Sequence, residues 1–359
     1  MRGMAWTRVL KCLCFVIVLL WASAGNGQQP RPGADTRNEA RDFFKGKIMT
    51  FIVGSRAGGS YDLMGRVLAE SLGKYTGATV VVKNVEGGGG IQGANMVYGS
   101  NPDGLTLGVI NAGLLQTQTL QGKGVKFDLG KFTWYGRVII QSDGTVVGAK
   151  GKYKSVEDLL SASSFKEGNA GAGSTGYFKS VLRAEAIGWN AEMVSGYANT
   201  SEMLLALIRG EIDVVATTWD VIHPFAKSGE VIPIVTSSDN GIPDYPGIRT
   251  LSKIPAVTKR LSERGKELLE LDARIGADGL GRIIAGPPGI SPDRAAYLEE
   301  TIQKRVLTDP DFIKKTEKMG EYTVGPLSGS ETLREIKRLI SIIEKHKAVI
   351  EEGLRKRQR

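Results

Sequence analysis

The chain has 359 residues, of which 41% are hydrophobic and 24% are charged. That composition supplies a large core for one or two domains and excludes a disordered chain. The 47 basic and 38 acidic residues leave a net charge of +9, but both signs are mixed along most of the sequence, so nucleic acid is not the expected partner. The 47 glycines are about twice the usual share of roughly 7% and require a local explanation.

The first 24 residues have the three parts of a secretory signal peptide. Basic residues precede an apolar run at 12–21, and Ala22-Ser23-Ala24 supplies the small side chains that signal peptidase recognises. A membrane anchor is the alternative, although ten apolar residues are fewer than the ~20 that cross a bilayer. We therefore predict cleavage near Ala24, a location outside the cytoplasm and a flexible leader at 25–44.

Strands alternate with helices from residue 47 onward, a pattern typical of α/β proteins. Apolar runs predict the strands, and apolar residues at helical spacing predict the helices, the first of which has Ser60 as its cap. The strands are predicted at 47–53, 79–83, 105–110, 144–149, 192–194, 212–217, 231–236 and 281–285. The helices are predicted after Ser60, at 94–98, 155–161, 177–187 and 201–209, after Ser291, and from Ser330 to about Arg355.

Three glycine-rich loops, at 54–59, 87–93 and 168–176, each lead into a predicted helix, and the first two follow a predicted strand. Glycine lets the backbone turn with positive φ and lets a ligand approach the peptide N–H groups. The N-terminus of the following helix adds partial positive charge. The loops therefore predict an anion-binding site.

Other readings of these loops fit less well. Gly88-x-Gly90-x-x-Gly93 matches the dinucleotide pattern, but no acidic residue ends the next strand about 20 residues later. There is no P-loop motif, so no nucleotide cofactor is expected. Residues 172–176 are similar to a nucleophile elbow, which leaves a secreted serine hydrolase with Ser174 and His223 as an alternative.

Metal binding is not expected either. Both cysteines, Cys12 and Cys14, lie in the predicted signal peptide, and the chain has only two histidines. The part beyond residue 24 therefore offers no thiol, no disulfide and no cluster of metal ligands.

Two segments resemble the substrate-binding receptors of tripartite tricarboxylate transporters, the Bug or TctC family. Residues 53–62 (VGSRAGGSYD) are similar to the family's first binding loop, Val-Pro-Phe-x-x-Gly-Gly-x-x-Asp. Residues 80–107 follow the family's second pattern from Asn84 through the glycines to Pro102-Asp103-Gly104. The likeness covers most of residues 47–325.

The resemblance implies a two-lobed Venus-flytrap fold, the type II periplasmic-binding-protein arrangement with mixed sheets flanked by helices. It places lobe 1 at 45–147 plus 240–359 and lobe 2 at 148–239, with a hinge motion that closes over the ligand. It also implies a ligand carboxylate held by backbone amides of the first lobe. Carried over by position, the ligand-binding residues are Arg56, Ala57, Gly58, Gly59, Ser60, Asp62, Asn84, Gly89, Gly90, Gly93, Ser174, Thr175, Tyr197 and Thr217.

Several positions depart from the family pattern. Gly54-Ser55 replaces Pro-Phe, and Arg56 stands at a small-residue position, where it either binds the carboxylate or forms a surface ion pair. Thr217 replaces a common Asp, which relaxes any preference for a ligand amine. Trp219 either stacks on an aromatic ligand or belongs to the core.

The resulting prediction is a monomeric, periplasmic, non-enzymatic receptor that binds a small organic carboxylate. It would deliver this ligand to the membrane permease subunits of a tripartite tricarboxylate-type transporter, without a cofactor. A receptor that presents its ligand to a membrane sensor kinase is the alternative within the binding class. The class of carboxylate is left open.

Overall fold

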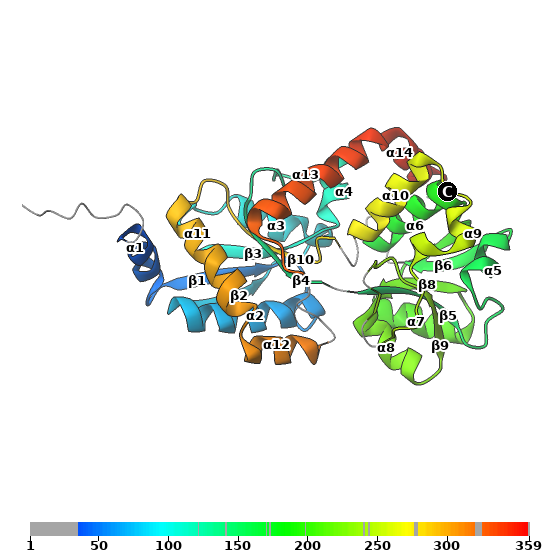
Figure 1. The fold of residues 1–359 in the computed structure, drawn as a ribbon, viewed down its shortest axis with the longest axis horizontal. Coiled ribbons are helices and arrows are strands. Elements are labelled where there is room, and N and C mark those ends of the chain that lie inside the picture. The colour runs from blue at the N-terminus through cyan, green and yellow to red at the C-terminus, as the bar shows by residue number, and fades with distance from the viewer. Residues whose placement is uncertain are drawn as a thin grey trace, which may run out of the picture.

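A computed structural model describes residues 35–357, apart from positions 121, 141, 170, 172–173, 198, 240, 243–244, 276–278 and 320–324. The predicted signal peptide and the leader as far as residue 34 lie outside the described residues. The rest of the chain forms two mixed sheets flanked by helices, which lie side by side as two lobes (Figure 1).

The first lobe is built on a five-stranded sheet with the order β2-β1-β3-β10-β4. β1 is parallel to β2 and β3, whereas β10 is antiparallel to β3 and β4. These strands run over Ile48–Val53 (β1), Thr79–Asn84 (β2), Thr106–Asn111 (β3), Thr133–Ile139 (β4) and Arg282–Gly286 (β10). Helices cover both faces of the sheet, which leaves its central strands buried.

The second lobe repeats this arrangement with the order β7-β6-β8-β5-β9. β6 is parallel to β7 and β8, and β5 is antiparallel to β8 and β9. These strands run over Asp143–Gly148 (β5), Phe165–Asn169 (β6), Ala191–Ser195 (β7), Val214–Thr218 (β8) and Val231–Val235 (β9).

The chain passes between the lobes immediately before the antiparallel strands β5 and β10. β5 begins at Asp143 and belongs wholly to the second sheet, so the predicted boundary at 147/148 is too late. The predicted assignment of 240–359 to the first lobe is also wrong in part. Arg260 donates to the carbonyls of Leu160 and Ile187, and two helices that follow it in sequence pack against the second lobe.

The helices of the first lobe include both N-terminal and C-terminal segments. They are α1 (Asp35–Phe44), α2 (Ser60–Thr76), α3 (Ile91–Tyr98), α4 (Leu114–Thr119), α11 (Pro292–Thr301), α12 (Pro310–Glu317) and α13 (Gly329–Lys345), with short turns at Gly88–Gly90 (η1) and Ile302–Val306 (η3). In α2, Met64, Leu68 and Leu72 are fully buried, as the helical spacing predicts, but Leu63 is exposed. Each buried side chain of this size stabilises the fold by about 1.5–3 kcal/mol.

The helices of the second lobe are α5 (Val156–Ser161), α6 (Thr175–Ile187), α7 (Thr200–Arg209), α8 (Trp219–Lys227), α9 (Pro255–Thr258), α10 (Glu263–Ile275) and α14 (Lys347–Arg357), with a short turn η2 at Leu251–Lys253. α10 and α14 both pack against α6. Ser155 caps α5, because its side chain accepts a hydrogen bond from the Asp158 N–H.

The second half of the predicted flexible leader forms α1. Phe44 is fully buried and its ring stacks on Tyr297 of α11, with ring centroids 5.5 Å apart. Arg294 lies over the Phe43 ring at 3.5 Å. These contacts order residues 35–44, so a flexible leader as far as residue 44 is wrong.

The predicted C-terminal helix is two helices that meet at His346. α13 packs on β4 of the first lobe, whereas α14 packs on α6 of the second (Figure 1). Gly353 permits the second contact, because a Cβ there would lie 2.8 Å from a Val181 methyl carbon. A single straight helix could not follow both lobes, and the sequence pattern alone does not reveal the change of direction.

The third glycine-rich segment begins in a strand rather than in a loop. Gly168 lies in β6, where a Cβ would meet the Ile212 side chain at 2.5 Å. Gly168 therefore allows close packing against Ile212. The strand β6 was not predicted from the sequence because glycine is rare in strands.

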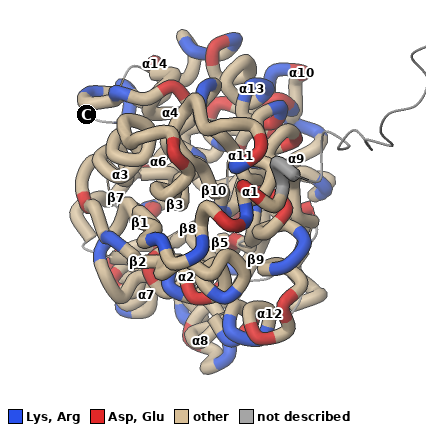
Figure 2. Tube along the Cα trace, turned by 90° about the vertical axis from the view of Figure 1, so that its left-hand side faces the viewer, with Lys and Arg blue, Asp and Glu red and all other residues tan. Residues whose placement is uncertain are grey.

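Basic and acidic residues are interspersed over the molecule instead of forming one charged face (Figure 2). Within residues 35–357 as described, every helix is too short or too polar to cross a bilayer.

Candidate functional site

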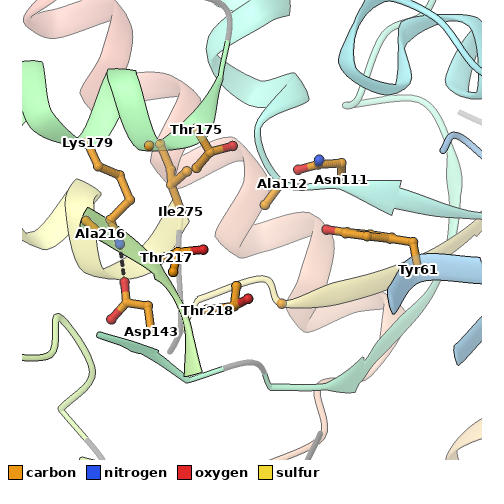
Figure 3. Close-up of a pocket in the computed structure, with 12 residues that line it drawn as sticks. Tyr61, Asn111, Ala112, Asp143, Thr175, Lys179, Ala216, Thr217, Thr218 and Ile275 are labelled. Atoms are coloured by element: carbon orange, nitrogen blue, oxygen red, sulfur yellow. Dashed lines mark hydrogen bonds and ion pairs between the residues drawn. The ribbon is translucent and has the colours of Figure 1, made fainter. Parts of the chain in front are cut away.

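A cavity of about 240 Å³ lies between the two lobes (Figure 3). It adjoins Asn111 at the end of β3 and Thr218 at the end of β8, the carboxyl ends of strands where α/β proteins bind ligands. A cavity of roughly 150 Å³ holds benzene, so this one has room for a somewhat larger molecule. Its lining residues are Tyr61, Asn111, Ala112 and Gly281 from the first lobe, and Asp143, Thr175, Gly176, Lys179, Ala216, Thr217, Thr218 and Ile275 from the second.

The first glycine-rich loop, residues 54–59, connects β1 to α2. Gly59 rather than Ser60 is the N-cap of α2, and no described side chain caps this helix. Ser60 is the first helical residue, and its side chain lies outside the described part of the structure. The backbone N–H groups of the first turn are therefore left for another acceptor. Tyr61, the next residue, lines the cavity.

Asp62 and Asn84 fix the shape of this loop. Asp62 is buried and accepts hydrogen bonds from the Gly58 N–H (2.8 Å), Arg66 Nε (3.0 Å) and Asn84 Nδ2 (3.0 Å). Asn84 Nδ2 also donates to the Ser55 carbonyl at 3.0 Å. Burial alone would raise the pKa of Asp62, but the hydrogen bonds from Arg66, Gly58 and Asn84 outweigh it and lower the pKa.

The second glycine-rich loop packs against the first, backbone to backbone. Gly87, Gly88, Gly89 and Gly90 all have positive φ, a conformation that other residues rarely adopt. A Cβ at Gly93 would lie 2.8 Å from the Gly54 Cα, and a Cβ at Gly54 would lie 3.1 Å from the Gly90 Cα. Gly90 also begins α3 without a side-chain cap among the described residues.

The packed loops reach the cavity at Asn111. A Cβ at Gly90 would lie 3.9 Å from the Asn111 Cβ, and Asn111 is one of the lining residues. None of the predicted glycines lines the cavity, and Gly90 approaches it through its contact with Asn111. The glycines concerned are Gly58, Gly59, Gly89, Gly90 and Gly93.

Arg56 and Ala57 lie at the exposed tip of the first loop. The Arg56 side chain is 87% exposed, and its Nε lies 3.0 Å from Glu86 Oε2. Of the two roles considered for Arg56, the structure contains the surface ion pair.

The third loop brings Thr175 to the cavity and uses Ser174 as a helix cap. Ser174 Oγ accepts from the Tyr177 N–H and donates to the Gly171 carbonyl at 2.8 Å. His223 lies on α8, where its ring contacts Trp219. Among the described residues there is no hydrogen bond between Ser174 and His223, so the hydrolase alternative has no assembled nucleophile and base.

Two predicted ligand residues of the second lobe face its core. Trp219 is 2% exposed and packs with Ile222 and Tyr245, and Tyr197 packs against the same cluster beside Gly168. Neither lines the cavity, in contrast to the predicted Thr175 and Thr217. Stacking of Trp219 on an aromatic ligand therefore does not fit this structure.

Sequence reasoning missed a buried ion pair in the cavity wall. Lys179 Nζ of α6 bonds to Asp143 Oδ2 of β5, and both residues line the cavity (Figure 3). Burial alone would raise the pKa of Asp143, but the charges of Lys179 and Arg183 and the hydrogen bonds to the carboxylate lower it to about 2. One feature of the sequence could have indicated this pair: Lys179 lies one helical turn after Thr175, within an apolar helix.

The pair extends into a larger buried network. Arg183 Nε and Nη2 donate to the two oxygens of Asp272 on α10, at 3.1 and 3.3 Å, and Lys179 Nζ lies 3.9 Å from the same carboxylate. Glu167 accepts from Trp189 Nε1 at 3.0 Å, and burial raises the pKa of Glu167. The network fixes α10, which lies just before the return to the first lobe, against α6.

A second missed residue, Arg282, lies behind the first-lobe wall. It is fully buried, and its guanidinium carbon lies 3.9 Å from the centroid of the Tyr61 ring. Arg282 thus holds the ring that forms this wall and places positive charge near it. Within the described residues no group of three or more His, Cys, Asp or Glu side chains could hold a metal ion.

The family model for tripartite tricarboxylate transporter family receptors matches residues 64–261, more than half of the chain. The chain belongs to this receptor family. The resemblance seen in the two loop segments is thereby confirmed, and the protein is a solute-binding receptor by family.

Solved structures of similar fold agree with this assignment. A TctC solute-binding protein from Polaromonas is 19% identical, with a TM-score of 0.66 over 83% of this chain and 98% of that one. MatC from Rhodopseudomonas palustris, solved with bound malate, is 19% identical, with a TM-score of 0.65 over 85% of this chain and 99% of that one. A second R. palustris protein, solved with adipate, is 20% identical, with a TM-score of 0.66 over 85% and 97%.

Proposed function

We propose that this receptor binds a small organic carboxylate in the cavity between its lobes. The observation that carries the proposal is that Tyr61 of the cavity wall lies in the first turn of α2, which starts at Gly59 without a described side-chain cap. This helix N-terminus provides N–H donors and partial positive charge for an anion. At the start of α3, in contrast, the N–H groups of Ile91 and Gln92 already bond to the carbonyls of Gly88 and Gly87. Family membership and the malate and adipate bound to similar structures support the same ligand class.

The carboxylate would bind to the loops at 54–60 and 87–93, and the rest of the ligand would extend past Tyr61 toward Thr175 and Thr217. Asp62 and Asn84 would not touch the ligand but would hold the first loop in its binding shape. Since the second wall belongs to the other lobe, closure about the interlobe connections would complete the site.

The remainder of the proposal concerns the receptor's setting. The predicted signal peptide supports a periplasmic location, and family membership supports a tripartite tricarboxylate-type transporter as the partner, whose permease subunits would receive the ligand. It would act by binding alone, without catalysis or a cofactor.

The test is a thermal-shift screen of residues 25–359, freed of co-purified ligand by unfolding and refolding. Mono-, di- and tricarboxylates are compared with their neutral amides. A ligand that binds only the folded state raises stability by about 2.7 kcal/mol at a hundredfold excess over Kd. We expect at least one acid to raise Tm while its amide does not. No shift with any acid, or equal shifts with acid and amide, would contradict the proposal.

A further inference from the structure

The second-lobe wall of the cavity contains one ammonium group with a free N–H. Lys179 is 6% exposed, and within the described residues its Nζ makes two hydrogen bonds, to Asp143 Oδ2 and to Ser237 Oγ at 3.0 Å. The next oxygen, of Asp272, is 3.9 Å away and beyond hydrogen-bond distance. An ammonium has three N–H groups, so one is left for an acceptor, and Lys179 lines the cavity.

Asp143, in contrast, has no capacity left for a ligand donor. Besides Lys179, it accepts from the Ser237 N–H at 3.0 Å, Thr236 Oγ1 at 3.2 Å and Ser237 Oγ. These four donors saturate the carboxylate. A ligand ammonium in this part of the cavity would lie near the positive charge of Lys179, and Asp143 could not accept a hydrogen bond from it.

The neighbouring wall is formed by Thr175, Thr217 and Thr218. Within the described residues their hydroxyls make no hydrogen bond, so each offers a donor and an acceptor to the cavity. Figure 3 shows Lys179 and these threonines across from Tyr61 and Asn111 of the first lobe. An apolar ligand end would bury the free N–H of Lys179 and the three hydroxyls without partners, which is unfavourable.

We propose that Lys179 is a specificity-determining residue, and that it selects carboxylates whose far end is a hydroxyl, carbonyl or carboxyl oxygen. This rests on the proposed function, since the first carboxylate of the ligand is taken to bind at the first-lobe loops. The same geometry rejects ligands whose far end is an ammonium or a methyl group. Asp143 and Ser237 position the Lys179 ammonium, and the threonines donate to or accept from the same ligand group.

The test uses acids that share one carboxylate and one chain length and differ only at the far end. At each length from four to six carbons, the unbranched acid with a terminal hydroxyl is compared with the dicarboxylate, the ω-amino acid and the methyl-ended acid by titration calorimetry. We expect the hydroxy acid and the dicarboxylate to bind at least tenfold more tightly than the other two. Equal binding of the methyl-ended acid, or preference for the amino acid, would overturn the proposal.

A variant pair assigns this selectivity to Lys179. Asp143→Asn/Lys179→Met removes both charges, which avoids leaving a buried Asp143 without its counter-charge. We expect it to bind the methyl-ended acid as well as the hydroxy acid. The control, Glu157→Gln/Arg249→Gln, removes a second-lobe ion pair with 2.8 Å bonds whose residues do not line the cavity, and should keep the wild-type preference.

The two proposals fail in distinguishable ways. If no acid binds the wild-type protein, the receptor function fails. If acids bind and their amides do not, but the double variant keeps the tenfold preference while it is folded by circular dichroism, only the role of Lys179 fails. If the double variant does not fold, Lys179→Arg replaces it: this variant keeps the charge but moves the donor, and an unchanged preference would overturn the assignment.

Discussion

Four helix N-termini differ between the two lobes. α2 and α3 of the first lobe start at Gly59 and Gly90, without a side-chain cap among the described residues. In the second lobe, α6 and α7 start at Ser174 and Asn199, whose side chains accept from backbone N–H groups of the first turn. α2 therefore keeps first-turn N–H donors for an external acceptor, whereas α6 and α7 satisfy theirs with side chains. Two helices depart from this contrast: α3 bonds the N–H groups of Ile91 and Gln92 to loop carbonyls, and α8 starts at Thr218 without a side-chain cap.

Both lobes bury charged side chains, such as Asp62 and Arg282 in the first, but their ion pairs near the cavity differ. The ion pair that links the two loops of the first lobe, Arg56–Glu86, is at the surface. The second lobe buries Lys179, Arg183, Asp143 and Asp272 together beside the cavity. This difference agrees with the two proposals above. Backbone groups of the first lobe would bind the carboxylate, and side chains of the second lobe would contact the rest of the ligand.

The largest expected effect comes from breaking the buried network. Arg183 is 1% exposed, and Arg183→Gln would leave Asp272 buried without its bidentate partner. We expect the free energy of unfolding in urea at pH 7 to fall by about 3–5 kcal/mol. The exposed pair Arg56–Glu86 gives the control, since Arg56→Gln should change the free energy of unfolding by less than about 1 kcal/mol. Similar losses in both variants would remove the contrast between the lobes.

A smaller loss is expected when the packed glycine loops are disturbed. Gly90 has φ of +103°, so Gly90→Ala introduces backbone strain of about 1–3 kcal/mol and distorts the second loop. Unfolding and acid binding should both weaken. Gly247→Ala is the matched control, because a Cβ there meets nothing within 4 Å. Full affinity in Gly90→Ala would show that the loops do not form the anion site.

Acid should weaken the second lobe through Asp143. Its pKa is about 2 in the folded protein and 3.8 ordinarily, so its stabilising contribution is complete above pH 3.8 and is lost as the pH falls toward 2. We expect wild-type stability, measured by urea unfolding, to decline over this range. Asp143→Asn/Lys179→Met should show a shallower decline, because it lacks this carboxylate. If the stability of the wild type and of the double variant declined equally with pH, other carboxylates would account for the whole loss.

The smallest change in stability is expected when the first lobe is given a cap like that of the second. Gly59 has φ of −80° and ψ of 167°, which a serine adopts without strain, and Gly59→Ser would add a side-chain acceptor for the first turn of α2. Stability should rise by a few tenths of a kcal/mol, while acid affinity falls because the serine competes for the N–H donors. Gly59→Ala supplies the control without a hydroxyl. Unchanged affinity in Gly59→Ser would place the carboxylate elsewhere.

Much of the fold and part of the site could be predicted from the sequence. The apolar runs predicted most strands, and the first two glycine loops lie between the predicted strands and helices. Thr175 and Thr217, predicted by position, line the cavity, and their contact with a ligand stays a prediction. Tyr197 and Trp219 do not line it, because an aromatic residue near a loop has the same local pattern whether it faces a cavity or a core.

The sequence by itself determined the α/β class, the family and the positions of the glycine-rich loops, because local periodicity and glycine conformation depend on neighbouring residues. Only the tertiary structure placed β5 in the second sheet, bent the C-terminal helix at His346 and brought Lys179 to Asp143, 36 residues away in the chain. These features depend on which faces meet across the lobes. Contacts between residues distant in sequence leave no periodic signal, so the second-lobe wall of the cavity could be identified only in the folded chain.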